Sequence, residues 1–205
     1  MRRAVIIGNG PVEADLGKRI DAADIVIRFN EPPYEPLRTG TKSDILFVVN
    51  SGKSMQGRLE NPAYLSSPHV ANASEIILPY EPSVIARYHP KPNVLSRIKG
   101  RKADWTGEAV AMFEQAGKAV AVLPAAFYEK CCETLGIAVG QRRSIFPSTG
   151  FVAIVHALER YPAVEWRVEI CGFGWHGWKR HDWQAERIWV DRQMAASSIR
   201  FIERA

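Results

Sequence analysis

The fold is decided by the stretch AVIIGNGPVEADLGKRIDAADIVIRFN, residues 4–30. It runs from an apolar, β-branched segment into the glycine turn GNGP at residues 8–11, and it ends on a second apolar segment, ADIVIRFN. Between them Val12, Leu16 and Ile20 recur at the spacing of one helix face. We therefore predict a strand, a tight turn, a helix and a second strand.

Further apolar segments alternate with helical patterns along the chain. The expected strands are SDILFVV at 43–49, SEIILPY at 74–80, KAVAVLP at 118–124 and RVEICGF at 167–173. The expected helices lie at about 105–117, 125–136, 149–160 and 183–203. This alternation predicts an α/β, Rossmann-like fold, a mostly parallel sheet of about six or seven strands with helices on both faces. Ligands of such sheets bind beyond the carboxyl ends of the strands.

Length and composition indicate one globular domain. A chain of 205 residues with 46% apolar residues can bury one continuous core but is short for two, so we expect a single domain over residues 1–205. No apolar run approaches the roughly 20 residues that span a bilayer and no secretory leader is recognisable, which favours a cytoplasmic protein. Cys131, Cys132 and Cys171 lack disulfide or metal-ligand spacing, so we expect buried, reduced thiols.

Positive charge is concentrated in one segment. The formal net charge is +5, and RYHPKPNVLSRIKGRK, Arg87 to Lys102, contains six lysines and arginines and no acid. Such a segment binds nucleic acid, the phosphates of membrane lipids or an acidic substrate, or it is a solvated loop. Composition alone leaves these alternatives open.

The turn GNGP contributes Gly8, Asn9 and Gly10 after the first strand. Glycines let the backbone approach a phosphate or ribose, and the helix expected behind them would offer free amides and a partial positive charge. Asn30 ends the second strand, where its amide can reach the same ligand as Asn9. The alternatives are an ordinary turn and a turn-capping asparagine. A dinucleotide fingerprint would need glycine in place of Glu13, which weakens an oxidoreductase interpretation.

The segment FPSTGF, residues 146–151, precedes the helix expected at 149–160. Ser148 or Thr149 would cap that helix, and the unpaired amides around Gly150 would suit a phosphate or a nucleotide. Helix capping without any ligand is the alternative.

A third polar segment, GWHGWKRHDWQAERIW, spans residues 174–189. Asp182 is a good N-cap, so His181 would stand just outside a helix, at its positive end. That position favours the neutral imidazole, the form required of a general base. Glu186 follows on the helix, and His176 precedes it after the sixth strand. With no H-x-x-x-H pair or third ligand, we expect no metal site.

The order and content of these motifs resemble the sialyltransferase family, glycosyltransferases that use CMP-activated sialic acid. Residues 4–30 resemble its long motif, and TGTKSDI at 39–45 resembles the continuation of that motif. PSTGFVAIVHAL at 147–158 resembles its short motif, and HDWQAE at 181–186 fits its very short motif, H-x4-E. The resemblance implies a bacterial-type member with the GT-A-like variant of the Rossmann-like fold.

The resemblance also implies roles for particular residues. His181 becomes the base that removes the proton from the acceptor hydroxyl, Glu186 orients the His181 loop or the helix below it, and His176 is the candidate contact to the phosphate. The residues implied to bind CMP are Gly8, Asn9, Gly10, Asn30, Ser148, Thr149 and Gly150.

The reaction implied is an inverting, metal-independent displacement that needs no cofactor. Sialic acid or a related 3-deoxy-ulosonic acid such as Kdo would pass from a CMP-sugar to a hydroxyl of a glycan or glycolipid. The absence of any Asp-x-Asp agrees with a reaction without a metal ion. The basic residues 87–102 would attract the acidic sugar, an anionic acceptor or the inner face of a membrane, and no nucleic acid is expected. The rival from another class is a non-catalytic nucleotide- or RNA-binding Rossmann-like module, which would tolerate the loss of His181.

Overall fold

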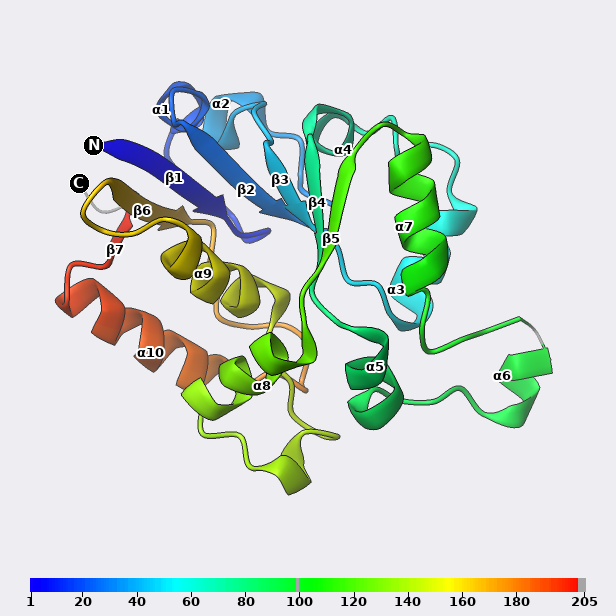
Figure 1. Ribbon diagram of the computed structural model, residues 1–205. Helices are drawn as coiled ribbons and strands as arrows, with labels where there is room; N and C mark the ends of the chain where they lie inside the picture. The colour runs from blue at the N-terminus through cyan, green and yellow to red at the C-terminus, as the bar shows by residue number, and fades with distance from the viewer. Residues whose placement is uncertain (99, 203–205) are drawn as a thin grey trace.

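The computed structural model describes residues 1–98 and 100–202, which form one sheet with helices on both faces (Figure 1). Lys99 and residues 203–205 lie outside the described residues. The seven strands lie in the order β5-β4-β3-β2-β1-β6-β7, and every neighbouring pair is parallel. The strands are β1 (Arg2–Ile7), β2 (Ile25–Phe29), β3 (Ile45–Phe47), β4 (Glu75–Leu78), β5 (Ala119–Val122), β6 (Trp166–Cys171) and β7 (Ile199–Phe201). The predicted parallel, Rossmann-like sheet is confirmed.

The helices fall into long ones that pack on the sheet and short ones that decorate its connections. They are α1 (Gly17–Asp21), α2 (Pro36–Thr39), α3 (Gly52–Glu60), α4 (Pro68–Asn72), α5 (Pro82–Tyr88), α6 (Val94–Ile98), α7 (Thr106–Gln115), α8 (Ala125–Thr134), α9 (Thr149–Arg160) and α10 (Trp183–Ala195), with a 3₁₀ turn at Val139–Gln141.

Alternate residues of the strands build the core on the two faces of the sheet. Ala4 and Ile6 of β1 pack toward α9 and α10, whereas Val5 and Ile7 pack on the α1 face. Because side chains alternate along a strand, a strand covered on both faces must be apolar throughout. That requirement explains the unbroken apolar run from Ala4 to Ile7, all of which is buried. The three cysteines are buried and unbridged, as expected.

The helix expected directly after GNGP was a wrong prediction. Residues 11–16 are a loop, and α1 begins only at Gly17. Val12 is fully buried in that loop, so its spacing to Ile20 reflects burial and not a continuous helix. The GNGP turn therefore has no helix N-terminus directly behind it.

The helix expected at 183–203 was too long. It ends at Ala195, Ser197 adopts a left-handed φ of 60°, and the chain turns back to form β7 beside β6. A left-handed residue cannot continue an α-helix, which explains the break. Residue 203 lies outside the described residues. The helix expected at 149–160 has the predicted bounds, and those expected at 105–117 and 125–136 are three and two residues shorter than predicted.

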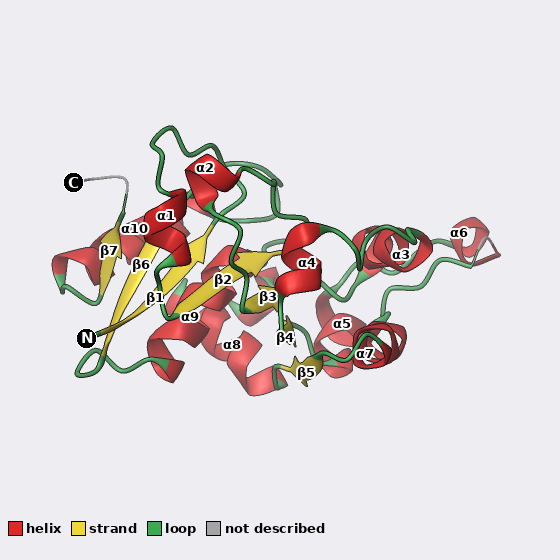
Figure 2. Ribbon diagram, turned by 90° about the horizontal axis from the view of Figure 1, so that it is seen from above, coloured by secondary structure: helices red, strands yellow, loops and turns green. Residues whose placement is uncertain are grey.

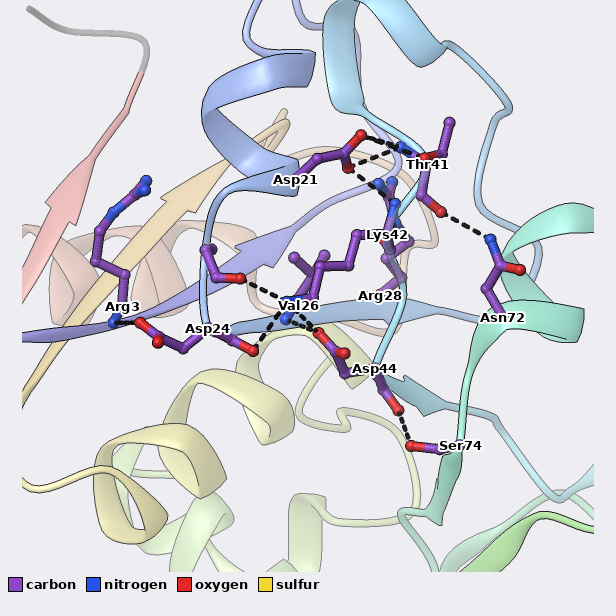
Figure 3. A network of polar contacts seen from close by, with 11 residues as sticks. Arg3, Asp21, Asp24, Val26, Arg28, Thr41, Lys42, Asp44, Asn72 and Ser74 are labelled. Carbon is purple, nitrogen blue, oxygen red and sulfur yellow. Dashed lines mark hydrogen bonds and ion pairs between the residues drawn. The ribbon is translucent and has the colours of Figure 1, made fainter.

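A polar network fastens the amino-terminal edge of the sheet (Figure 3). Asp24 accepts a hydrogen bond from the Arg3 amide at 2.7 Å, and Asp44 accepts one from the Val26 amide at 2.7 Å. The carboxylate of Asp21 accepts bonds from the amides of residues 41 and 42, both at 2.9 Å. Carboxylates that accept from backbone amides make charge-assisted bonds, so this edge is held rigidly.

The opposite, carboxyl-terminal edge of the sheet is the edge toward which the strand arrows point in Figure 1. The chain order of the strands reverses at β1, which pairs with β2 on one side and β6 on the other. Such a reversal leaves a crevice beyond the strand ends. The amino terminus lies far from α6, which projects from the body in both views (Figures 1 and 2). In the part of the chain that is described, no helix combines the length and apolar character needed to cross a bilayer.

Candidate active site

The GNGP turn lies against the exit of β6. The amide of Gly8 donates to the Cys171 carbonyl and that of Gly10 to the Gly172 carbonyl, both at 2.8 Å. A Cβ on Gly8 would lie 2.2 Å from the Gly172 oxygen, so a side chain there is excluded by the backbone directly after β6. The glycines are thus required for the close approach of two chain segments, and this approach forms the floor of the crevice.

Asn9 and Asn30 hold the ends of β1 and β2 together from this crevice. Asn9 Nδ2 donates to the Phe29 carbonyl at 3.2 Å. Asn30 adopts a left-handed φ of 53°, which asparagine tolerates better than most residues, and its Oδ1 accepts from the Val49 amide at 3.0 Å. Within the described residues, Asn9 Oδ1 and Asn30 Nδ2 have no hydrogen-bond partner, so an acceptor and a donor are available to a ligand.

The start of α9 forms the next wall. Ser148 caps the helix by accepting a bond from the Phe151 amide at 3.0 Å, as the sequence predicts. The amides of Thr149 and Gly150 point out of the first turn without such a cap, where they can bind an anion. A side-chain hydrogen bond joins Thr149 to Tyr80.

Glu186 supports this wall from behind and does not contact the His181 loop with its carboxylate. Its two oxygens accept from the Ser148 amide at 2.7 Å and the Ser148 hydroxyl at 2.6 Å. The side chain is fully buried, and burial raises the pKa of Glu186 to about 7 against the opposing effect of the Ser148 bonds. The carboxylate of Glu186 thus fixes the cap of α9, and its role in orienting the His181 loop or the helix below it stays a prediction.

His181 stands one residue before the N-cap of α10. Asp182 caps that helix through a 3.0 Å bond from the Ala185 amide, as predicted. His181 Nδ1 donates to the Phe146 carbonyl at 2.8 Å, which leaves the lone pair of Nε2 free. Burial lowers the pKa of His181, so the imidazole is neutral near pH 7. A neutral imidazole of fixed tautomer is suited to accept a proton.

His176 lies on the opposite wall, in the loop after β6. Its side chain is exposed, and Nδ1 donates to the Gly174 carbonyl at 2.7 Å. The neighbouring Trp175 has a left-handed φ of 51° and stacks on Phe173. His176 thus borders the same crevice as His181, and its hydrogen bond within the described residues is to its own loop.

One cavity collects nearly all of the residues predicted to form the site. It has a volume of about 320 Å³ and also contacts Phe29, Phe173 and Trp183. The predicted residues that line it are Gly8, Asn9, Gly10, Asn30, Ser148, Thr149, Gly150, His176 and His181. Glu186 alone is excluded, because it is buried behind Ser148.

A larger cleft of about 640 Å³ adjoins this cavity and was missed by sequence reasoning. Asn30, Thr149 and His181 line both spaces, so His181 stands where they meet. The other residues of the cleft include Ser51, Lys53, Tyr80, His89, Lys91, Arg101 and Lys102. A usable signal existed, since NSG at 50–52 and PY at 79–80 follow β3 and β4 just as GNGP follows β1.

His89 forms a polar pair with Ser51 inside the larger cleft. Its Nδ1 lies 2.9 Å from the Ser51 hydroxyl, and its ring packs edge-on against Tyr80 and Phe146. Burial, assisted by the charge of Arg180, lowers the pKa of His89 to about 4. This histidine is therefore neutral over the physiological range.

A parallel α/β sheet with unpaired amides and a neutral histidine at its strand-order reversal is typical of enzymes that bind a ligand in this crevice. The chain belongs to glycosyltransferase family 29, the sialyltransferases, whose family model matches residues 1–188. The family membership implied by the long, short and very short motifs is confirmed. Among the described residues, no three His, Cys, Asp or Glu side chains gather as a metal ion would require.

Relatives of this chain include both a curated bacterial protein and solved enzymes. The urease operon 23 kDa accessory protein of Rhizobium meliloti (strain 1021) is 29% identical over 203 residues, 97% of this chain and 92% of that protein. A mammalian sialyltransferase in complex with Gal-beta-1-3GalNAc-ortho-nitrophenol matches with a TM-score of 0.60 and 21% identity, over 98% of this chain and 69% of its own. The sialyltransferase CstII from Campylobacter jejuni, in complex with cytidine-5'-monophosphate, matches with a TM-score of 0.55 and 14% identity, over 98% and 79%. These structures support the fold.

Proposed function

We propose that this glycosyltransferase moves sialic acid, or a related 3-deoxy-ulosonic acid such as Kdo, from a CMP-sugar to a hydroxyl of a glycan or glycolipid, with inversion and without a metal ion. The observation that carries the proposal is the position of His181, which lines both cavities and whose Nδ1 is bonded to Phe146, so that Nε2 is left to accept a proton. A donor in one cavity and an acceptor in the other would place the acceptor hydroxyl beside the base.

In this proposal the smaller cavity binds CMP. Asn9 Oδ1 and Asn30 Nδ2 supply one acceptor and one donor to the nucleotide, and the amides of Thr149 and Gly150 receive the phosphate. CMP is a weakly basic leaving group, so the reaction depends on stabilising the charge of its phosphate. The CMP complex of the Campylobacter enzyme supports this choice of nucleotide, since that enzyme shares the fold.

His181 is the proposed general base, and the larger cleft is the proposed acceptor site. As the hydroxyl oxygen attacks the anomeric carbon, its proton passes to His181 Nε2 and CMP departs on the opposite side, which inverts the configuration. His176 faces the CMP cavity and is proposed to contact the departing phosphate. A positioned base contributes about 10²- to 10⁴-fold to such a reaction.

Incubation of the purified protein with CMP-sialic acid and with CMP-Kdo tests the proposal. We expect CMP release from one donor to be stimulated by a glycan acceptor, to persist in EDTA, and to give a product of inverted anomeric configuration by NMR. Loss of activity in EDTA would refute metal independence. A product with retained anomeric configuration would refute inversion. Binding of CMP without turnover of any CMP-sugar would favour the non-catalytic nucleotide-binding module.

A further inference from the structure

A short helix on the connection between β4 and β5 presents apolar side chains to solvent. Val94, Leu95 and Ile98 of α6 are 70%, 72% and 77% exposed, and no residue of this helix is buried. Both views show α6 standing away from the body of the molecule, at the end opposite the amino terminus (Figures 1 and 2). Aliphatic residues gathered on one projecting element mark a contact surface, because single exposed residues are normally scattered.

The surroundings of these aliphatic residues are positive. Three cations lie within α6 or close to it in the sequence: Lys91, Arg97 and Arg101. No salt bridge joins any of the three to an acid in the described part of the chain. Residues 87–102 contain no aspartate or glutamate at all. Aliphatic side chains ringed by uncompensated cations match a membrane whose headgroups are anionic.

Residues of α6 and of the segments beside it also form a wall of the larger cleft. Lys91, Ser96 and Arg101 line the space that His181 borders. Any surface that binds α6 would therefore lie beside the opening of the larger cleft.

We propose that α6 docks the protein on an anionic lipid bilayer, with Val94, Leu95 and Ile98 inserted among the acyl chains and the flanking cations on the headgroups. A second copy of the chain is disfavoured by size, since three aliphatic residues are far fewer than the roughly 20–30 residues a side of a stable protein interface. Docking goes beyond the proposed transfer reaction and gives the basic segment a function that the sequence alone left open.

Co-sedimentation of the full chain with vesicles tests this proposal. We expect binding to phosphatidylglycerol-containing vesicles, weaker binding as salt rises, and little binding to pure phosphatidylcholine. Leu95→Glu should lower the partition coefficient at least about tenfold, because it replaces an inserted apolar side chain by a charge. Leu37→Glu is the matched control, since Leu37 is 77% exposed on α2 and should leave binding unchanged.

Charge reversal provides a second pair of variants. Arg97→Glu should weaken vesicle binding at least about fivefold, whereas Arg192→Glu, on the exposed face of α10, should not. Failure of the wild-type protein to bind anionic vesicles would overturn the proposal, as would equal losses in Leu95→Glu and Leu37→Glu.

Two further outcomes would assign α6 to another partner and overturn membrane docking. One is a concentration-dependent dimer, seen by sedimentation, that Leu95→Glu abolishes while vesicle binding persists. The other is a loss of transfer to a soluble acceptor, without vesicles, in Leu95→Glu, which would indicate a lid over the cleft. CMP should raise the melting temperature of every variant as much as that of the wild type. This measurement distinguishes a failure of donor binding from a failure of membrane docking.

Discussion

The polar side chains at the two edges of the sheet differ in whether they are fully hydrogen-bonded. At the amino-terminal edge, Asp21, Asp24 and Asp44 all accept hydrogen bonds from backbone amides of neighbouring segments. At the carboxyl-terminal edge, Asn30 and His181 line a cavity, and Asn30 Nδ2 and His181 Nε2 have no hydrogen-bond partner in the described chain. Paired groups hold a fold together, whereas unpaired groups directed into a cavity are available to a ligand.

This contrast divides the long motif at residues 4–30 into two functions. Arg28 is almost fully buried and donates to the Lys42 carbonyl at 2.9 Å and the Thr39 carbonyl at 2.5 Å, so it fastens the loop before β3. Asn30, two residues later, lies at the cavity. Motif residues near the start of β2 and on its buried face thus stabilise the sheet, whereas Asn30, just beyond its end, lines the cavity proposed to bind the ligand.

The largest expected effect is on catalysis at the carboxyl-terminal edge. His181→Ala should lower the rate of sugar transfer about 10²- to 10⁴-fold, because the proposed proton acceptor is removed. The affinity for CMP, measured by calorimetry, should change little, since the proposed nucleotide contacts come from other residues. A transfer rate within twofold of wild type would remove His181 from the role of base.

A large effect on stability is expected at the amino-terminal edge. Asp21→Ala removes the carboxylate that binds the amides of Thr41 and Lys42. We expect the free energy of unfolding to fall by about 3 kcal/mol and the melting temperature by about 6–12 °C. Asp15→Ala, at an exposed position, is the control and should leave stability unchanged. If CMP affinity instead of stability is lost in Asp21→Ala, the division between the edges is wrong.

The pH dependence of stability should reveal the titration of Glu186, the buried residue behind the candidate active site. Its pKa is raised to about 7, so over the range from pH 4.5 to 7 the unfolded chain loses this proton more readily than the folded one. Stability from this group is therefore complete below pH 4.5 and is lost as the pH rises through 7. Relative to Glu186→Gln, the wild type should lose up to about 3 kcal/mol of unfolding free energy over that range.

Comparison with the glutamine variant is necessary because the histidines whose pKa burial lowers, His69, His89, His156 and His181, act in the opposite direction. The pKa values of His69 and His89 are lowered to about 4, so both stabilise the fold as the pH rises. Subtracting the two denaturation profiles cancels their contribution. A difference between wild type and Glu186→Gln that is constant with pH would show that Glu186 titrates normally.

The smallest effect compares two exposed asparagines at opposite edges. Asn9 Nδ2 donates to the Phe29 carbonyl at 3.2 Å, and Asn72 Nδ2 donates to the Thr41 carbonyl at 3.1 Å. Asn9→Ala should weaken CMP binding about 5- to 30-fold, the loss of one or two hydrogen bonds. Asn72→Ala should leave CMP binding unchanged in the same calorimetric titration. Equal effects from both variants would contradict the contrast between the edges.

Much of the fold could be predicted because local signals agree with the tertiary structure. The unbroken apolar run at residues 4–7 matches a strand buried on both faces, and Ser148 both precedes and caps the helix predicted at 149–160. The short helices between residues 50 and 100 carry little such signal. In α3 only Met55 and Arg58 are buried, and in α6 no residue is, so no apolar periodicity marks them.

The smaller cavity of the candidate site could be predicted from the sequence, whereas the larger cleft could not. Asn9 and Asn30 follow strands directly, so the parallel sheet alone brings them together. His89 and Arg101 reach the larger cleft only because the connection between β4 and β5 folds back over the carboxyl-terminal edge. That path depends on tertiary packing such as the contact of His89 with Phe146, which no local pattern encodes.

We propose that the unpaired groups at the carboxyl-terminal edge form a CMP site beside a histidine base. A crystal structure of the protein with CMP tests this proposal most directly. We expect the nucleotide in the 320 Å³ cavity, with Asn9 and Asn30 on the nucleoside and the Thr149 and Gly150 amides at the phosphate. CMP bound elsewhere, or absent from this cavity at saturating concentration, would contradict it.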